Sequence, residues 1–95
     1  MIKIICESDL FNPDENPNLK RIAPNFGWGD DFIKQLDSLP TDSVVNFRNI
    51  LFVKRKDGLW DMYSKYSNSK LDEPVDSKNV DFYTNQGLYG LYIPQ

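Results

Sequence analysis

Apolar and polar positions alternate most clearly between residues 43 and 66, where three apolar runs are separated by two polar turns. The runs cover residues 43–47, 50–55 and 59–66. Each run has the length and the β-branched or aromatic content of a strand. Asp57-Gly58 predicts a tight second turn, because glycine accepts a positive φ. In the first turn we expect Asn49 to take the positive φ, which asparagine adopts less favourably than glycine. The segment therefore predicts a three-stranded antiparallel meander.

The middle run differs from its neighbours because residues 50–53 are all apolar. Successive side chains of a strand point to opposite faces of a sheet, so a continuous apolar run indicates burial on both faces. The third run instead alternates Trp60 and Met62 with Asp61. We therefore expect the middle strand to lie at the centre of the core.

Helical spacing of apolar residues occurs just before the meander. The residues concerned are Phe32, Ile33, Leu36 and Leu39. Gly29 is the expected N-cap, and carboxylates at Asp30 and Asp31 favour the positive end of a helix dipole. Trp28 is placed to pack onto the first turns as a hydrophobic staple, and Pro40 ends the segment. This pattern predicts one short helix over residues 30–37.

The remaining segments complete the predicted fold. Residues 1–6 are expected to form a short strand near a sheet edge, and residues 80–83 and 88–93 suggest two more strands. Between residues 7 and 24, prolines at 13, 17 and 24 predict a long loop, because each disfavours helix at the preceding residue. The prediction is an α+β fold in which a small antiparallel sheet, the meander plus terminal strands, carries one short helix.

Composition excludes most catalytic chemistry. The chain has 95 residues, no histidine and one cysteine, a length that indicates a single domain over residues 1–95. Common zinc sites and histidine-activated nucleophiles need residues that the chain lacks, and Cys6 lies in an apolar segment that favours a buried thiol. We therefore expect a protein that is not an enzyme and that has no metal or cofactor. With no apolar stretch near the roughly 20 residues of a membrane span and no secretory signal, we expect it in the cytoplasm.

Charge is unevenly distributed along the chain. Residues 1–42 carry a net charge of −4, residues 43–66 of +3 and the remainder of −2. Cations interleaved with aromatic residues can hold phosphates and stack bases, which makes the meander a candidate nucleic-acid surface. Its residues are Arg48, Lys54, Arg55, Lys56 and Trp60. The same cations would also keep a hairpin soluble, and the aromatic residues of a strand are commonly core.

The acidic parts of the chain suggest a different partner, a basic groove on another protein. The chain also has more aromatic rings than a core of this size needs, and tyrosine is favoured at protein interfaces. The candidate residues for this surface are Glu7, Asp9, Phe11, Asp14, Glu15, Asp30, Asp31, Tyr83, Tyr89 and Tyr92. Solvation of the carboxylates and core packing of the rings remain the alternatives.

One stretch resembles a known class of proteins. Residues 39–45, Leu-Pro-x-x-Ser-Val-Val, and residues 51–60, which end in Asp-Gly-Leu-Trp, are similar to a hairpin segment of small uncharacterised phage and mobile-element proteins. The likeness covers under a quarter of the chain and lacks the glycine often found where Asp42 stands. It implies a phage origin, and small phage proteins of this kind often bind and block host factors, including defence nucleases.

Two functional hypotheses follow. The first is a phage-encoded inhibitor or modulator of a host protein, of the anti-CRISPR or anti-restriction type. Its expected partners include host proteins that themselves bind nucleic acid. The alternative is a small nucleic-acid-binding module that uses the basic meander.

Overall fold

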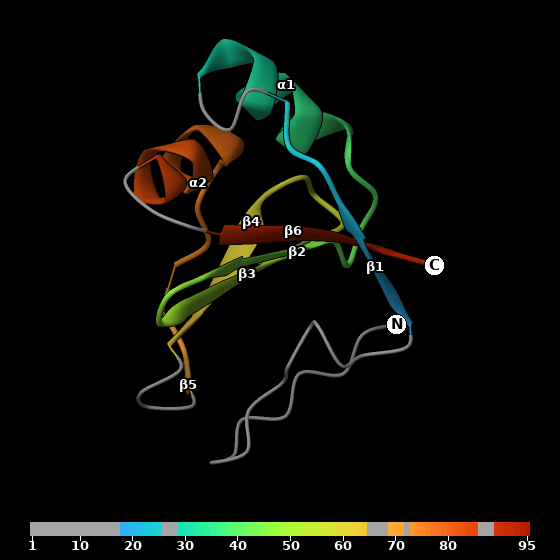
Figure 1. Cartoon of the computed structure of the whole chain (residues 1–95). Coiled ribbons are helices and arrows are strands. Elements are labelled where there is room, and N and C mark those ends of the chain that lie inside the picture. Colours follow the sequence, from blue (N-terminus) through green and yellow to red (C-terminus); the bar gives the residue numbers. More distant parts are fainter. Residues whose placement is uncertain (1–17, 26–28, 65–68, 72, 86–88) are drawn as a thin grey trace.

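The computed structural model describes residues 18–25, 29–64, 69–71, 73–85 and 89–95, and it has two layers. One layer is an antiparallel sheet in the order β1-β6-β2-β3-β4-β5, and the other consists of helices α1 and α2, which cover one face of the sheet (Figure 1). The elements are β1 (Leu19–Ile22), α1 (Asp30–Ser38), β2 (Val44–Phe47), β3 (Ile50–Lys54), β4 (Trp60–Ser64), β5 (Ser69–Lys70), α2 (Ser77–Thr84) and β6 (Tyr89–Pro94). The predicted α+β class and the meander β2-β3-β4 are confirmed.

Strand β3 lies between β2 and β4 and has apolar side chains on both faces. Phe52 joins the cluster under the helices, which includes Phe32 and Leu36 of α1 and Val80 of α2. Leu51 joins a second cluster that is made only of strand residues. The central strand is therefore buried on both sides, as its continuous apolar run predicts.

Helix α1 forms where helical spacing predicts it. Gly29 is its N-cap, Asp30 and Asp31 lie in its first turn, and Phe32 and Leu36 are fully buried. The helix ends before Leu39, whose backbone is extended. Trp28 lies outside the described residues, so its expected packing on this helix stays a prediction.

The expected strand at residues 80–83 is wrong, because this segment belongs to helix α2. The carboxylate of Asp76 accepts a hydrogen bond from Asn79 N at 2.9 Å, which caps the helix. Ser77, Val80 and Thr84 then share one buried face at helical spacing. The sequence has strand-like composition here, but the cap and the spacing of its buried residues are those of a helix.

The expected loop over residues 7–24 is also wrong in part. Leu19–Ile22 forms edge strand β1, which pairs with β6 from Leu19↔Pro94 to Ile22↔Leu91. A second short strand, β5, lies at the opposite edge and pairs with β4. The backbone of residues 19–22 thereby obtains hydrogen bonds from the last strand, which sequence-local signals do not reveal. The strand expected at residues 1–6 lies outside the described residues.

The meander turns differ in how they use positive φ angles. Gly58 has a φ of 89°, as expected for the second turn. In the first turn the positive φ of 46° falls on Arg48, so the expectation for Asn49 is wrong. A third position, Asp42, has a φ of 72° just before β2. Aspartate tolerates this left-handed region better than most residues, but glycine adopts it without a steric penalty.

We predict opposite effects of glycine at two neighbouring positions. Asp42→Gly should leave the free energy of unfolding unchanged or raise it, and Asp42→Ala should lower it by about 1 kcal/mol, because alanine is strained at positive φ. Thr41 has no positive φ, so Thr41→Gly should lower it by roughly 0.5–1 kcal/mol. Urea unfolding of the variants measures these differences, and an Asp42→Gly protein less stable than Asp42→Ala would contradict the assignment.

Candidate functional site

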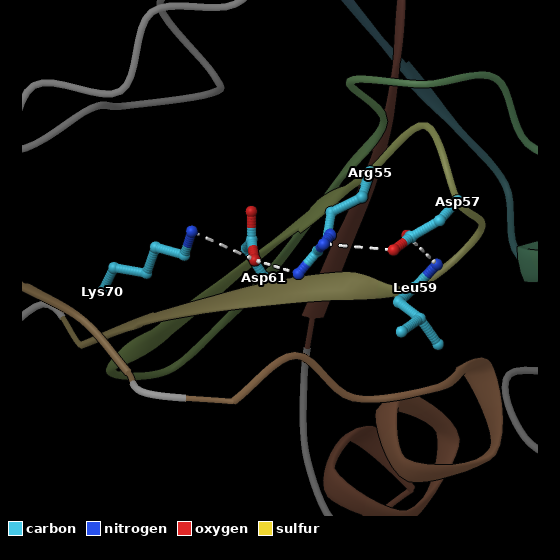
Figure 2. Close-up of polar contacts among 5 residues, drawn as sticks. All are labelled: Arg55, Asp57, Leu59, Asp61 and Lys70. Atoms are coloured by element: carbon cyan, nitrogen blue, oxygen red, sulfur yellow. Dashed lines mark hydrogen bonds and ion pairs between the residues drawn. The ribbon is translucent and has the colours of Figure 1, made fainter.

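The cations of the meander are partly neutralised by an ionic network. Figure 2 shows Arg55 between Asp57 and Asp61, with Lys70 on the other side of Asp61. The nitrogen–oxygen distances are 3.1 Å for Arg55–Asp57, 3.5 Å for Arg55–Asp61 and 3.5 Å for Lys70–Asp61. Two cations therefore share two carboxylates, which reduces the positive field that a phosphate would meet.

Lys54 and Trp60 belong to the interior, and this corrects their assignment to a nucleic-acid surface. Lys54 is 5% exposed, and its Nζ donates to the carbonyl oxygens of Leu36 at 2.6 Å and Asp37 at 2.8 Å. Trp60 is fully buried, and its Nε1 donates to Ser77 Oγ at 3.1 Å. A buried indole cannot stack a base, so of this candidate set only Arg48, Arg55 and Lys56 retain access to solvent.

Burial also changes the acidity of Lys54. Removal of the ammonium group from water lowers the pKa of Lys54, and the negative charge of Asp37 partly opposes this effect. The ammonium lies 5.7 Å from the centre of the Trp60 ring and under the last carbonyls of α1, where a cation is favoured by the helix dipole. Lys54 therefore acts as a cap for the C-terminal end of α1.

The structure does not describe the side chains of several acidic and aromatic candidates. Glu7, Asp9, Phe11, Asp14 and Glu15 lie outside the described residues. Of Tyr89, only the backbone in β6 is described.

Tyr92 is buried, so its expected exposure on a partner surface is wrong. It is 2% exposed and belongs to the sheet cluster on the face away from the helices. Gly90 explains this position, because a Cβ there would lie 2.7 Å from the Tyr92 ring. The ring therefore lies over a residue without a side chain, and the Arg21 guanidinium lies 5.8 Å from its centre. The Gly-x-Tyr spacing is the sequence signal for this packing.

Asp30, Asp31 and Tyr83, in contrast, lie on neighbouring elements of the helical layer. Gly29 N donates to Asp81 Oδ1 at 2.8 Å, which joins the start of α1 to the middle of α2. Tyr83 is 38% exposed, and its ring centre lies 5.8 Å from that of the buried Phe52. Tyr83 therefore covers the core with one part of its ring and presents the rest to solvent.

Phe82 is a candidate residue that the sequence analysis did not identify. It is 62% exposed, the highest exposure of any large apolar side chain in the described part of the chain. Its ring meets that of Tyr83 edge to face, with centres 6.1 Å apart. On a helix whose Ser77, Val80 and Thr84 face the sheet, position 82 points to the opposite side. The helical spacing of those three residues would have revealed it.

We call this region the α2 surface and define it by its residues. They are Phe82 and Tyr83 together with Asp30, Asp31 and Asp81. Among the described residues, no three cysteine, aspartate or glutamate side chains are grouped so that they could hold a metal ion. Neither described helix has the length and apolar character needed to cross a membrane. Comparisons with protein families, curated proteins and solved structures found no match to this chain.

The lowered pKa of Lys54 predicts how stability changes with pH. Between the lowered folded pKa and the ordinary lysine value of 10.5, the native state binds fewer protons than the unfolded state, so Lys54 makes unfolding less favourable as pH rises. We therefore expect the free energy of unfolding of the wild type, minus that of Lys54→Met, to increase from pH 7 to pH 10.5. Urea unfolding across this range measures it, and the subtraction removes titrations common to both proteins. A constant or decreasing difference would contradict burial of the ammonium.

Proposed function

We propose that the chain is a non-catalytic protein-binding module that contacts its partner through the α2 surface. The observation that carries this proposal is the exposure of Phe82, which is 62%, on a helix whose opposite face is packed against the sheet. Phe82 belongs to neither of the two apolar clusters of the described core. It is suited to fill a pocket on another protein, where aromatic residues are frequent hot spots.

Burial of the Phe82 ring would contribute part of the binding free energy. A whole aromatic side chain has roughly 150–250 Å² of surface, and Phe82 is 62% exposed, so its burial by a partner would contribute about 2–4 kcal/mol before the costs of association. Tyr83 supports Phe82 by an edge-to-face contact and itself rests on Phe52. Its contact with the buried Phe52 limits the freedom of Tyr83 before binding, so less side-chain entropy is lost on association.

The biological role that we propose is inhibition or modulation of a host protein by a phage-encoded chain that works in the host cytoplasm. Its target would be a factor such as a defence nuclease, of the CRISPR or restriction type. The support is the resemblance of the hairpin over residues 39–60 and the absence of histidine from the chain. Inhibition by binding through an exposed ring needs no catalytic group, so the resemblance and the lack of histidine both fit this role.

Nucleic-acid binding by the meander is less well supported. Lys54 and Trp60 are buried, and Arg55 shares the carboxylate of Asp61 with Lys70. Of the candidate set, Arg48, beside the ring of Phe47, and Lys56 are the exposed cations outside the ionic network. Two such cations give a weaker electrostatic footprint than the five-residue set that the sequence suggested.

We predict that Phe82→Ala abolishes function without loss of stability. The chain, produced in bacteria that carry a CRISPR or restriction nuclease, should raise the plating efficiency of a susceptible phage, and Phe82→Ala should remove this effect because it deletes the anchor ring. Its free energy of unfolding should change by no more than about 0.5 kcal/mol, as for other exposed positions.

Leu71→Ala is the matched control, since Leu71 is also an exposed apolar residue, 40% exposed, but follows β5 at the sheet edge. It should retain the protective effect. Equal protection by the wild type and by a stably folded Phe82→Ala protein would remove the α2 surface from the proposal.

A further inference from the structure

The helical layer has a strong excess of negative charge. Residues 29–38 and 73–85 contain six carboxylates and two lysines, a net charge of −4. The carboxylates belong to Asp30, Asp31, Asp37, Glu73, Asp76 and Asp81, and the cations are Lys34 and Lys78. Lys54 reaches this layer from β3, but its ammonium is buried under α1. The exposed aromatic rings of α2 therefore belong to a layer whose net charge is negative.

We propose that the α2 surface accepts a basic, arginine-bearing segment of a partner protein, an inference that rests on the protein-binding function proposed above. Complementary charge guides association and excludes wrong partners. An arginine side chain suits the centre of this surface because its planar guanidinium stacks on aromatic rings and pairs with carboxylates. Phe82 and Tyr83 supply the exposed rings, and Asp30 and Asp31, exposed in the first turn of α1 that Asp81 joins to α2, supply the carboxylates.

The same charge argues against two other occupants. A second copy of this chain would bring an equal acidic surface against the first, and like charges across an interface are unfavourable. A nucleic acid would bring phosphates against carboxylates. Among the described residues, Asp57 and Asp61 do not provide an equally acidic site, because they are paired with Arg55 and Lys70 (Figure 2).

Lys78 allows a test in which removal of a positive charge and removal of negative charges should change the binding affinity in opposite directions. It lies one helical turn before Phe82 and is exposed, and it is the single cation of α2. If the partner segment is basic, Lys78 opposes binding while Asp30 and Asp31 favour it. A contact driven only by apolar burial would respond to none of these three charges.

The experiment begins with a defined probe, a library of random twelve-residue peptides displayed on phage particles. The library is selected on immobilised full-length chain and counter-selected on Phe82→Ala. We expect the enriched peptides to carry a net positive charge. Relative to the starting library, arginine should be enriched more strongly than lysine. Enriched peptides that are neutral or acidic would overturn this inference but leave the protein-binding function in place. Recovery of no Phe82-dependent peptide would overturn both.

Titration of a selected peptide by fluorescence anisotropy then gives the sign of each charge effect. Asp30→Asn with Asp31→Asn should weaken binding about two- to tenfold, and Lys78→Gln should strengthen it about 1.5- to fivefold, as expected for exposed charge pairs. Asn49→Lys with Asp57→Asn makes the same change of net charge at the meander turns and should have little effect. All of these differences should shrink when the salt concentration is raised from 50 to 300 mM.

Three results would overturn the basic-partner assignment. One is equal weakening by the helix pair and the meander pair, which would indicate net charge alone. Another is weaker binding with Lys78→Gln. The third is a dimer in analytical ultracentrifugation that Phe82→Ala dissociates, which would assign the surface to a second copy of the chain.

Discussion

The polar atoms of Lys54 and Trp60 fix the position of the helical layer on the sheet, within the apolar cluster that the two layers share. Lys54 Nζ donates to the last carbonyls of α1, and Trp60 Nε1 donates to Ser77 at the start of α2. The backbone of Trp60 also exchanges two hydrogen bonds with Val75, at 2.7 and 2.8 Å. A buried donor left without an acceptor costs about 1–3 kcal/mol, so these contacts strongly favour one position for each helix.

The position of α2 determines which side chains meet solvent. In a strand, Val80 and Phe82 would share one face, and burial of the first would bury the second. In the helix they are separated by about 200° around the axis, so Val80 is fully buried and Phe82 is exposed. The bridge between Trp60 and Val75 fixes the chain just before α2, and Asp76 then caps the helix. The orientation of this helix leaves the ring of Phe82 exposed.

The meander and α1 could be predicted because their signals are local, as with Gly58 at a turn and Phe32 and Leu36 at helical spacing. Strand β1 and helix α2 depend on partners distant in sequence, β6 and Trp60, and were missed. Lys54 shares strand parity with Ile50 and Phe52, so its inward direction was present in the sequence, but its charge suggested exposure. Of the residues that we assign to the proposed α2 surface, Asp30, Asp31 and Tyr83 were named from the sequence, whereas Asp81 and Phe82 required α2 to be recognised as a helix.

Amide hydrogen exchange of Ser77→Ala tests most directly whether the sheet holds α2 in place. This change removes the acceptor of Trp60 Nε1 and leaves a good helix former at the first position of α2. We predict faster exchange at the amides of Val80 and Asn85, which donate within and at the end of α2, and retained protection in the β2–β3 ladder. Unchanged exchange in α2, or an equal loss of protection throughout the sheet, would contradict this account.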